Sequence, residues 1–482
     1  MIVLWCILGV LAALLLICIL RAALMKPTAA KATVFDTVPD ARAHAYGEKL
    51  GALIRCETVS EMVQPDKSKF YAFHEELERQ FPLVHQKMEK TVLDGSLLFS
   101  LPGGGKDLPP VLLMSHHDVV EAPGAWRHPP FSGEIADGRV WGRGTLDTKG
   151  SLFCILQAAE ELLAGGWQPP YDFYIASACT EETLGTGAKA TAAYLKEKGV
   201  RLGLLIDEGG MVLDAPLAGV TGLYALVGVL EKGYGDLRFT AAGNGGHSSM
   251  PAPGTPIPRL AAFVHQVETH DPFTPKMNAT VREMLRRMAP NAGFGMRVIF
   301  GNLWLFSPLL AHLLPVVSPL AGAMVKTTIA FTTMQGSSGL NVVPERAYVT
   351  GNLRFIHHQG ADESIARMTA LAKRYGLETE VITKEYPCAV VSHDTSAFRL
   401  IERCAETCYP GVCVTPYAMT GGTDAKYYNG ICDNCLRFAP LYCDGQQLES
   451  IHGRDENLYL AALPKGVDFY KSVLAGWPAE QK

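Results

Sequence analysis

The stretch VLLMSHHD (residues 111–118) joins a short apolar run to a polar cluster. The four apolar residues are typical of a buried strand, so the cluster is expected where that strand ends. In extended chain, His116 and Asp118 point to the same side while His117 points away. A histidine that binds metal usually donates its second ring nitrogen to a carboxylate, and Asp118 is well placed to accept it. Taken alone, this pattern is only a weak sign of a metal site.

The alternation of apolar runs and polar clusters continues along the chain. Strand-like runs follow at 173–178 and 202–206, and helical patterns at 151–163 and 188–198 lie between the runs. Strands that alternate with helices predict an α/β fold, with a mostly parallel sheet covered by helices on both faces. Ligands bind at the carboxyl ends of the strands in such sheets. The polar clusters are expected at those ends.

Between residues 222 and 383 the pattern changes to that of a smaller antiparallel sheet. Strands are expected at 223–230, 236–242, 327–334 and 346–355, and helices at 256–268 and 362–375. We therefore predict a catalytic domain made of residues 39–221 and 384–482. Residues 222–383 would form an inserted, smaller α+β lid domain of a dimerisation type.

Two strongly apolar stretches are candidates for contact with a membrane. The run from Ile2 to Leu20 is about 19 residues, roughly 28 Å as a helix, which is enough to cross a bilayer. It lacks the basic start of a signal peptide, so we predict a retained anchor at residues 1–21, followed by a tether at 22–38. The second stretch, Leu303–Val325, is interrupted by prolines. We interpret it as buried or membrane-facing lid helices rather than a second span.

The composition excludes two classes of protein. Hydrophobic residues make up 48% of the 482 residues, so a large core can form and general disorder is excluded. The net charge of -5 gives no basic surface for nucleic acid. The 12 cysteines follow no zinc-finger or disulfide-scaffold spacing. We interpret the single CxxC at Cys432 and Cys435 as ordinary thiols, or at most one local bridge.

Other polar clusters contain further candidate catalytic or metal-binding residues. Asp147 ends the glycine-rich stretch WGRGTLD just before a helix, where alone it would be an N-cap. Glu181 and Glu182 are adjacent, and two carboxylates at close range are costly unless cations hold them. A metal would let one glutamate act as a ligand and the other take a proton from water. His452, in a late loop, would by itself more often be structural.

The clusters together favour a metal centre. They provide two imidazoles and three carboxylates: His116, Asp147, Glu182, Asp207 and His452. This set suits zinc, with manganese or cobalt as substitutes. Five ligands exceed the number that one tetrahedral zinc uses, but they fit two metals that share a bridging carboxylate.

With these motifs the sequence resembles the di-zinc metallopeptidases that include carboxypeptidase S, glutamate carboxypeptidase and aminoacylase. The matching motifs are HxD at His116, GRGxxDxKG around Asp147, the Glu181–Glu182 pair, DEGG at Asp207, GHSSxP from Gly246, NVxP from Asn341, Arg354, GGTDA from Gly421, and His452. The apolar insert and the N-terminal hydrophobic segment look most like the branch of carboxypeptidase S and the N-fatty-acyl-amino-acid synthase/hydrolase.

The resemblance implies a role for each matching residue. Asp147 would bridge two Zn²⁺ ions, with His116 and Asp207 on one and Glu182 and His452 on the other. Glu181 would be the general base, and Asp118 would orient His116. His247 would stabilise the oxyanion, from the neighbouring subunit in dimeric relatives. The substrate carboxylate would be held by Arg354, Asn341, Gly421, Gly422 and Thr423. Two departures from the family pattern are Thr180 before the glutamate pair and Lys426 in place of the common arginine.

The expected function is hydrolysis of amide bonds next to a free carboxylate. Substrates would be N-acyl amino acids, N-fatty-acyl ones included, or short peptides. One alternative is a carboxypeptidase or dipeptidase with no preference for an acyl chain. A membrane-tethered inactive scaffold is a remote alternative, which the presence of Glu181 disfavours. We expect a single N-terminal membrane pass, an extracytoplasmic catalytic domain by resemblance, and a homodimer.

Overall fold

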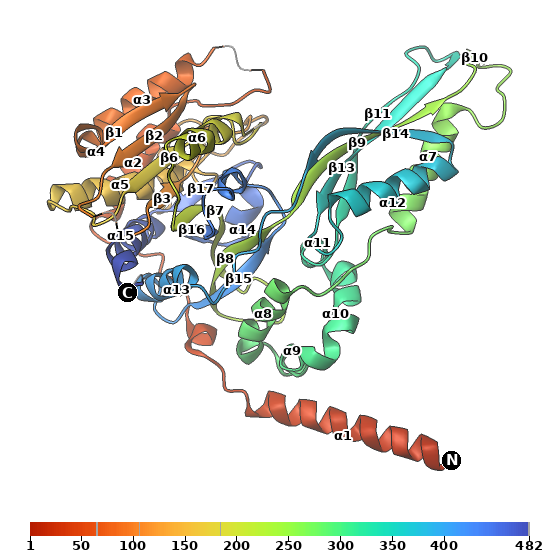
Figure 1. Ribbon diagram of the computed structural model, residues 1–482, viewed down its shortest axis with the longest axis horizontal. Helices are drawn as coiled ribbons and strands as arrows, with labels where there is room; N and C mark the ends of the chain where they lie inside the picture. Colours follow the sequence, from red (N-terminus) through yellow and green to blue (C-terminus); the bar gives the residue numbers. More distant parts are fainter. Residues whose placement is uncertain (64–65, 106, 184, 481–482) are drawn as a thin grey trace.

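An eight-stranded sheet organises the larger part of the molecule (Figure 1). The structure is a computed structural model that describes residues 1–63, 66–105, 107–183 and 185–480. The strands lie in the order β1-β2-β6-β3-β7-β16-β8-β15. Their bounds are β1 Glu89–Leu93, β2 Ser96–Leu101, β3 Val111–Met114, β6 Phe173–Ser177, β7 Leu204–Asp214, β8 Leu223–Glu231, β15 Cys413–Met419 and β16 Cys435–Cys443.

Most pairs in the centre of this sheet are parallel. Strand β3 pairs in parallel with β6 and β7, β7 with β16, and β8 with β15. The antiparallel pairs include β1 with β2, β2 with β6, and β7 with β8. A short side sheet is formed by β4 Glu134–Ala136, β5 Arg139–Trp141 and β17 Asn457–Tyr459. The prediction of a mostly parallel α/β sheet is confirmed.

Helices cover both faces of the large sheet because its central strands have consecutive apolar residues, so that both faces are apolar. In β3, Val111 and Leu113 join one buried core, whereas Leu112 and Met114 join another on the opposite face. The first core includes residues of α2 Ala43–Ile54, α3 Ser68–Gln80, α4 Pro82–Lys87, α5 Lys149–Ala164, α13 Ser396–Cys408 and α15 Ala462–Glu480. The second core includes residues of α6 Thr186–Glu197 and of the 3₁₀ turn η3 Asp424–Tyr428.

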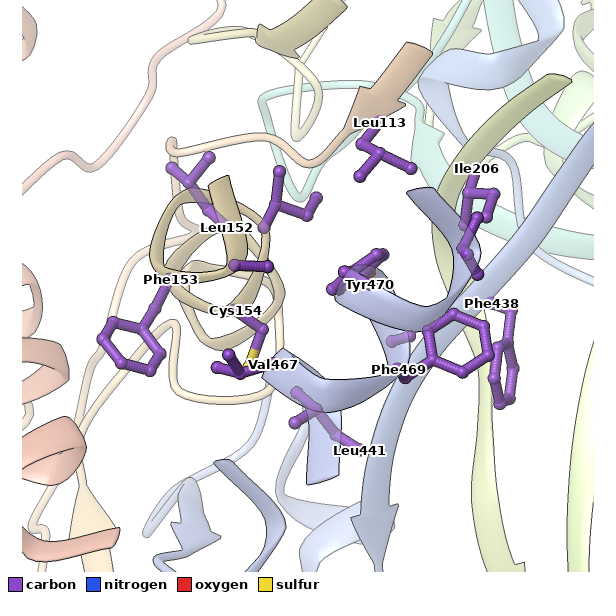
Figure 2. Close-up of a cluster of buried hydrophobic side chains, with 14 of the residues drawn as sticks. Leu113, Leu152, Phe153, Cys154, Ile206, Phe438, Leu441, Val467, Phe469 and Tyr470 are labelled. Atoms are coloured by element: carbon purple, nitrogen blue, oxygen red, sulfur yellow. The ribbon is translucent and has the colours of Figure 1, made fainter. Parts of the chain in front are cut away.

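Figure 2 shows how the first core is built. Side chains of α5 and α15 face one another and the strands β3, β7 and β16, with Leu113 and Ile206 at the sheet. Phe469 of α15 packs against Phe438 of β16, with ring centroids 5.3 Å apart (Figure 2). This core fixes the strands whose ends carry the polar clusters.

A second, antiparallel sheet forms the lid. Its order is β11-β13-β9-β14, with β9 Gly233–Ala242, β11 Thr328–Gln335, β13 Arg346–Phe355 and β14 Leu377–Glu385. Helices α7 Pro256–Thr269 and α12 Ala361–Arg374 pack on it through a common apolar core. A two-stranded ribbon, β10 Gly246–His247 with β12 Val342–Val343, lies at the far end of the lid (Figure 1). The predicted α+β lid is confirmed.

One predicted strand belongs to the other sheet. We expected residues 223–230 in the small sheet, but β8 pairs with β15 and β7 in the large one. Every residue of β8 is buried, which is typical of a strand with both faces covered, whereas β9 alternates. The fourth lid strand is instead β14, which pairs with β9. The division of the chain at residues 222 and 383 itself stays a prediction.

A set of helices joins the lid to the catalytic sheet. They are α8 Ala279–Met288, the 3₁₀ turn η2 Ala289–Asn291, α9 Phe294–Phe300, α10 Leu303–Val317 and α11 Pro319–Ala323. The apolar stretch 303–325 thus forms two helices of the insert that break at Ser318. Helices α9 and α10 meet at an angle of 107°.

The N-terminal helix α1, Ile2–Leu24, projects away from the body (Figure 1). It is apolar and long enough to cross a membrane, and a signal sequence would have the same properties. The 3₁₀ turn η1 Ala29–Ala32 follows it. Cys432 and Cys435 are both buried free thiols, in agreement with the interpretation as ordinary thiols.

Candidate metal centre

Separate segments of the catalytic domain bring six polar side chains together. They are His116 after β3, Asp147 before α5, Glu181 and Glu182 after β6, Glu208 within β7, and His452 after the short helix α14 Gly445–Ser450. Strands β3, β6 and β7 are neighbours in the sheet, so residues at their carboxyl ends meet. His452 has a φ of 57°, a left-handed conformation that turns its loop into the site.

Asp147 lies between two imidazoles. Its Oδ1 is 3.0 Å from Nε2 of His116, and its Oδ2 is 3.1 Å from Nε2 of His452. Glu208 Oε1 lies 3.3 Å from the same nitrogen of His116, and Glu182 Oε2 lies 3.2 Å from that of His452. Two groups of three possible ligands therefore share one carboxylate, a geometry that fits two cations.

The charges of the site also fit cations. Burial raises the pKa of Glu208 to about 8, and a neighbouring carboxylate adds to this. Burial and nearby carboxylates hold the pKa of Glu181 well above its usual range. Hydrogen bonds to Asp147 and Glu182 raise the pKa of His452 to about 10. The buried Oε1 of Glu182 accepts no hydrogen bond among the described residues, which leaves it free to bind a cation.

Glu208, not Asp207, provides the carboxylate beside His116. The pairing of β7 with β16 shifts register just after Asp207, so that Glu208 and Gly209 form a bulge. Bulges redirect side chains and are common next to active sites. Asp207 instead accepts hydrogen bonds from the backbone N–H groups of Glu208 and Ala425, both at 2.8 Å. The prediction of Asp207 as a ligand does not fit this geometry, and Glu208 takes its place.

Asp118 contacts both halves of the site. Nδ1 of His116 lies 2.9 Å from the backbone oxygen of Asp118 and 3.4 Å from its Oδ1. The two carboxylate oxygens accept hydrogen bonds from the backbone N–H groups of Glu181 and Glu182, each at 3.1 Å. Ser60 donates a further hydrogen bond, at 2.7 Å. Asp118 therefore fixes the ring of His116 and also the turn that carries the glutamate pair.

Glu456 is a buried support that sequence reasoning missed. Its Oε1 accepts hydrogen bonds from the backbone N–H groups of Gly144, Leu146 and Asp147, at 2.8–3.1 Å. Its Oε2 pairs with Arg143 at 2.6 Å. Glu456 thus holds the loop of Asp147 from the loop of His452. Each loop contains a charged residue, Arg143 or Glu456. No sequence pattern indicates that two residues 313 positions apart form an ion pair.

A cavity of about 360 Å³ opens on the cluster. Its lining includes Asp147, Glu181, Glu182, Glu208, His452, Gly421, Gly422 and Thr423. The turn at 421–423 is therefore next to the possible ligands. A β-carbon on Gly422 would lie 4.0 Å from Nη1 of Arg354 and 3.6 Å from Nζ of Lys426. Two cations therefore lie close to this turn, together with the buried carboxylate of Glu231, which accepts hydrogen bonds from the backbone N–H and Oγ1 of Thr423.

His247 and Asn341 are elsewhere. Both are exposed at the far end of the lid, where the N–H of Ser248 donates to the backbone oxygen of Asn341 at 3.0 Å. Neither lines the cavity. The structure therefore keeps these two predicted residues together, but it does not bring them to the metal centre of the same chain.

A second, apolar cavity of about 510 Å³ adjoins the first. Gly209, Met211, Thr420 and Ile451 line both. The rest of the second lining is mostly apolar and includes Leu213, Leu217, Leu226, Met284, Met288, Leu320 and Met324. Its walls come from β7, β8, α8 and α11, so the insert helices reach the edge of the metal centre.

The family model of peptidase family M20/M25/M40 matches residues 112–476. The chain is 34% identical over 436 residues to an N-fatty-acyl-amino acid synthase/hydrolase, PM20D1, of Xenopus tropicalis, covering 89% of this chain and 85% of the relative. It is 32% identical over 452 residues to a probable carboxypeptidase S-like protein of Dictyostelium discoideum, covering 92% and 83%.

Solved structures share the fold. The M20 family metallo-carboxypeptidase Sso-CP2 of Sulfolobus solfataricus superposes with a TM-score of 0.66 at 16% identity, covering 91% of this chain and all of that one. Human carnosine dipeptidase 1 gives a TM-score of 0.61 at 14% identity, covering 91% and 97%. The family match spans well over half of the residues. The chain therefore belongs to peptidase family M20/M25/M40 and is a metallopeptidase-type hydrolase of amide bonds.

Proposed function

We propose that this chain is a di-zinc hydrolase that cleaves the amide bond of N-acyl amino acids, long-chain ones in particular. The observation that carries the proposal is the position of Asp147, with one carboxylate oxygen toward each of two imidazoles. His116 and Glu208 complete one set of ligands, and Glu182 and His452 complete the other. Zinc suits such imidazole and carboxylate donors, with manganese or cobalt as substitutes.

When bound, two divalent cations would lower the pKa of a water molecule and polarise the carbonyl of the scissile amide. The proton transfers are carried out by a side chain of the protein. Glu181 lines the same cavity but belongs to neither set of ligands, so its carboxylate is free to take a proton from the attacking water. Its raised pKa suits the second half of the reaction, in which it would give that proton to the leaving amine.

The substrate's free carboxylate needs a cationic partner. Arg354 and Lys426 lie near Gly422, and the planar fork of Arg354 is suited to a carboxylate. Lys426 is partly engaged, because its Nζ donates to Glu385 at 2.8 Å. We propose that Arg354 is the main contact and that the turn at 421–423 closes around the carboxylate.

The acyl chain would lie in the apolar cavity. This cavity shares four lining residues with the metal centre, so a chain that enters it starts next to the scissile carbonyl. Its volume is within the usual range for small-molecule sites. Methionine side chains, which adapt to flexible ligands, make up much of the wall. The similarity to the synthase/hydrolase of Xenopus supports this substrate class.

We also propose that α1 is retained as an anchor and that the catalytic domain lies on the extracytoplasmic side. The exposed positions of His247 and Asn341 at the lid end support a homodimer, because a second copy could supply them to the site. A peptidase with no acyl preference is the competing function, and the substrate test below separates the two.

Neighbouring carboxylates on β7 provide a matched test of the ligand set. Glu208→Gln should weaken zinc binding at least about tenfold, because it removes a ligand. Asp207→Asn should weaken it much less, because within the described residues the Asp207 carboxylate accepts hydrogen bonds only from two backbone N–H groups. Titration of the chelated chain with zinc measures both affinities. The reverse order would restore Asp207 as the ligand.

Glu181 can be tested apart from metal binding. Glu181→Gln should lower kcat by about 100-fold or more, since general-base catalysis contributes on that scale. Its zinc content should match that of the unmodified chain. Glu378→Gln, on the exposed face of the lid, is the control and should leave kcat unchanged. Full activity of Glu181→Gln would remove this residue as the base.

The pKa shifts predict how metal-free stability depends on pH. The pKa of Glu208 is raised from 4.5 to about 8, so folding favours its protonated form and stability falls as pH rises through that window. The pKa of His452 is raised from 6.5 to about 10, so the stability from its imidazolium is also lost as pH rises. Thermal unfolding of the chelated chain should therefore occur at lower temperature at about pH 9 than at about pH 6.

Zinc should reduce this loss, because cations replace protons as partners of the carboxylates. Glu208→Gln should also show a smaller decline, since one of the titrating groups with a raised pKa is gone. An unfolding temperature that rises with pH in the chelated chain would contradict the described arrangement of charges.

The length of the substrate's acyl chain tests whether this acyl chain binds in the apolar cavity. Each buried methylene contributes about 0.8 kcal/mol, so kcat/KM should rise several-fold for each methylene from N-acetyl to N-oleoyl amino acids until the cavity is filled. Met288→Trp should lower kcat/KM for the long substrate and leave that for the N-acetyl substrate unchanged. Met334→Trp, exposed on the lid, is the matched control. A preference for dipeptides, unchanged in Met288→Trp, would favour the peptidase alternative.

A further inference from the structure

Helices α9, α10 and α11 expose a continuous apolar surface, here called the apolar corner. Its exposed side chains are Phe294, Trp304, Leu305, Leu309, Leu313, Val316, Val317 and Leu320. Several are far more exposed than ordinary apolar surface residues, with Val316 at 81% and Leu309 at 67%. Large exposed apolar surfaces mark sites that another molecule or a membrane covers.

The pattern of α10 is the opposite of that of a water-facing helix. A helix on the surface of a soluble domain has polar residues on its outer face. The outer face of α10 has no charged residue, and its inner face contains the polar Ser307. His312 is the one ionisable residue of α10, and its Nδ1–H donates to the backbone oxygen of Pro308 at 2.9 Å. Its local hydrogen bond reduces its need for water.

The apolar corner is joined to α1. Cys18 and Ala22, near the C-terminal end of α1, are buried, whereas most of the helix is exposed. Nδ2 of Asn302, at the bend between α9 and α10, donates to the backbone oxygen of Cys18 at 3.1 Å. Arg297 of α9 donates to the backbone oxygen of Met25 at 3.3 Å. A membrane that holds α1 therefore meets α9 and α10 at the same place.

The distribution of charged and aromatic residues also favours a membrane as the partner of the apolar corner. No aspartate or glutamate occurs between residues 284 and 330, whereas Arg21 and Lys26 flank the end of α1. Anionic lipid head groups attract such basic residues and would repel acidic ones. Trp304 is the second residue of α10 and donates through Nε1 to Oδ1 of Asn302 at 3.3 Å. An exposed tryptophan with a satisfied N–H suits the boundary between lipid and water.

The apolar cavity ends at this surface. Leu320 lines the cavity and is also 44% exposed as part of the apolar corner. Val316 and Val317 lie just before it at the end of α10. The cavity wall and the outer surface are thus formed by one short segment, so a membrane on the corner would lie next to the cavity.

We propose that the apolar corner is embedded among the acyl chains of the bilayer that holds α1, as a second, non-spanning membrane contact. The bend of 107° keeps α9 and α10 from crossing the bilayer as one straight helix, so they enter only one leaflet. Leu320 then faces lipid, and a long acyl chain reaches the apolar cavity from the membrane without passing through water. That last consequence rests on the proposed substrate class, and the membrane contact rests on the proposed retention of α1 as an anchor.

Trp304 serves as the probe of this contact. The full-length chain is reconstituted into phosphatidylcholine vesicles with or without bromine on the acyl chains, beside the variants Trp304→Phe and Trp126→Phe. The emission of Trp304, taken as the difference between the unmodified chain and Trp304→Phe, should be blue-shifted and largely quenched by bromine. The emission of Trp126, from the catalytic domain, should not be quenched. Neither signal requires catalysis.

Two results would overturn the proposal. Unquenched emission with a water-like maximum would mean that the corner faces solvent, and unquenched but blue-shifted emission would mean that protein, such as a second copy, covers it. A second variant changes the apolar corner away from position 304 and leaves Trp304 in place as the probe. Leu309→Asp with Val316→Asp should reduce the quenching of Trp304, whereas Met334→Asp on the exposed face of the lid should not. Equal quenching in all three chains would also count against the proposal.

Discussion

The candidate metal centre depends on several carboxylates that are buried close together. Asp147, Glu181, Glu182 and Glu208 line one cavity with the exposed imidazole of His452. The buried imidazole of His116 contacts Asp147 and Glu208. Burying several carboxylates together is unfavourable unless cations compensate them. Without metal, the two histidines and retained protons reduce the repulsion, as the raised pKa values of Glu208 and His452 indicate. The surrounding fold keeps these groups from moving apart.

The supports of the site come from distant parts of the chain. Glu456 holds the loop of Asp147, and Asp118 holds both His116 and the turn of the glutamate pair. Each support accepts hydrogen bonds from backbone N–H groups, so it fixes the main chain that carries the possible ligands. The apolar core of α5, α15 and the sheet then holds these loops in register. Stability and chemistry are thus linked through a few buried carboxylates.

The sequence predicted the mostly parallel sheet, and most of the candidate residues that it singled out lie close together in the structure. The bounds of β3 and β13 match the predicted ranges, because each pattern is bounded by polar or turn residues. Strand β8 was assigned to the wrong sheet, because a continuous apolar run does not say which layers cover it. Asp207 was taken for Glu208, because alternation along a strand fails at a bulge, which depends on the pairing with β16. The separation of His247 and Asn341 from the metal centre depends on how the lid is oriented relative to the catalytic domain. No local sequence pattern encodes this orientation.

The account rests on two cations that share Asp147. Anomalous diffraction at the zinc edge, from crystals of the zinc-loaded chain, tests this directly. Two peaks about 3.5–4 Å apart, one beside His116 and Glu208 and the other beside Glu182 and His452, are the predicted result. A single peak, or a peak bound by Asp207 with Glu208 turned away, would contradict it.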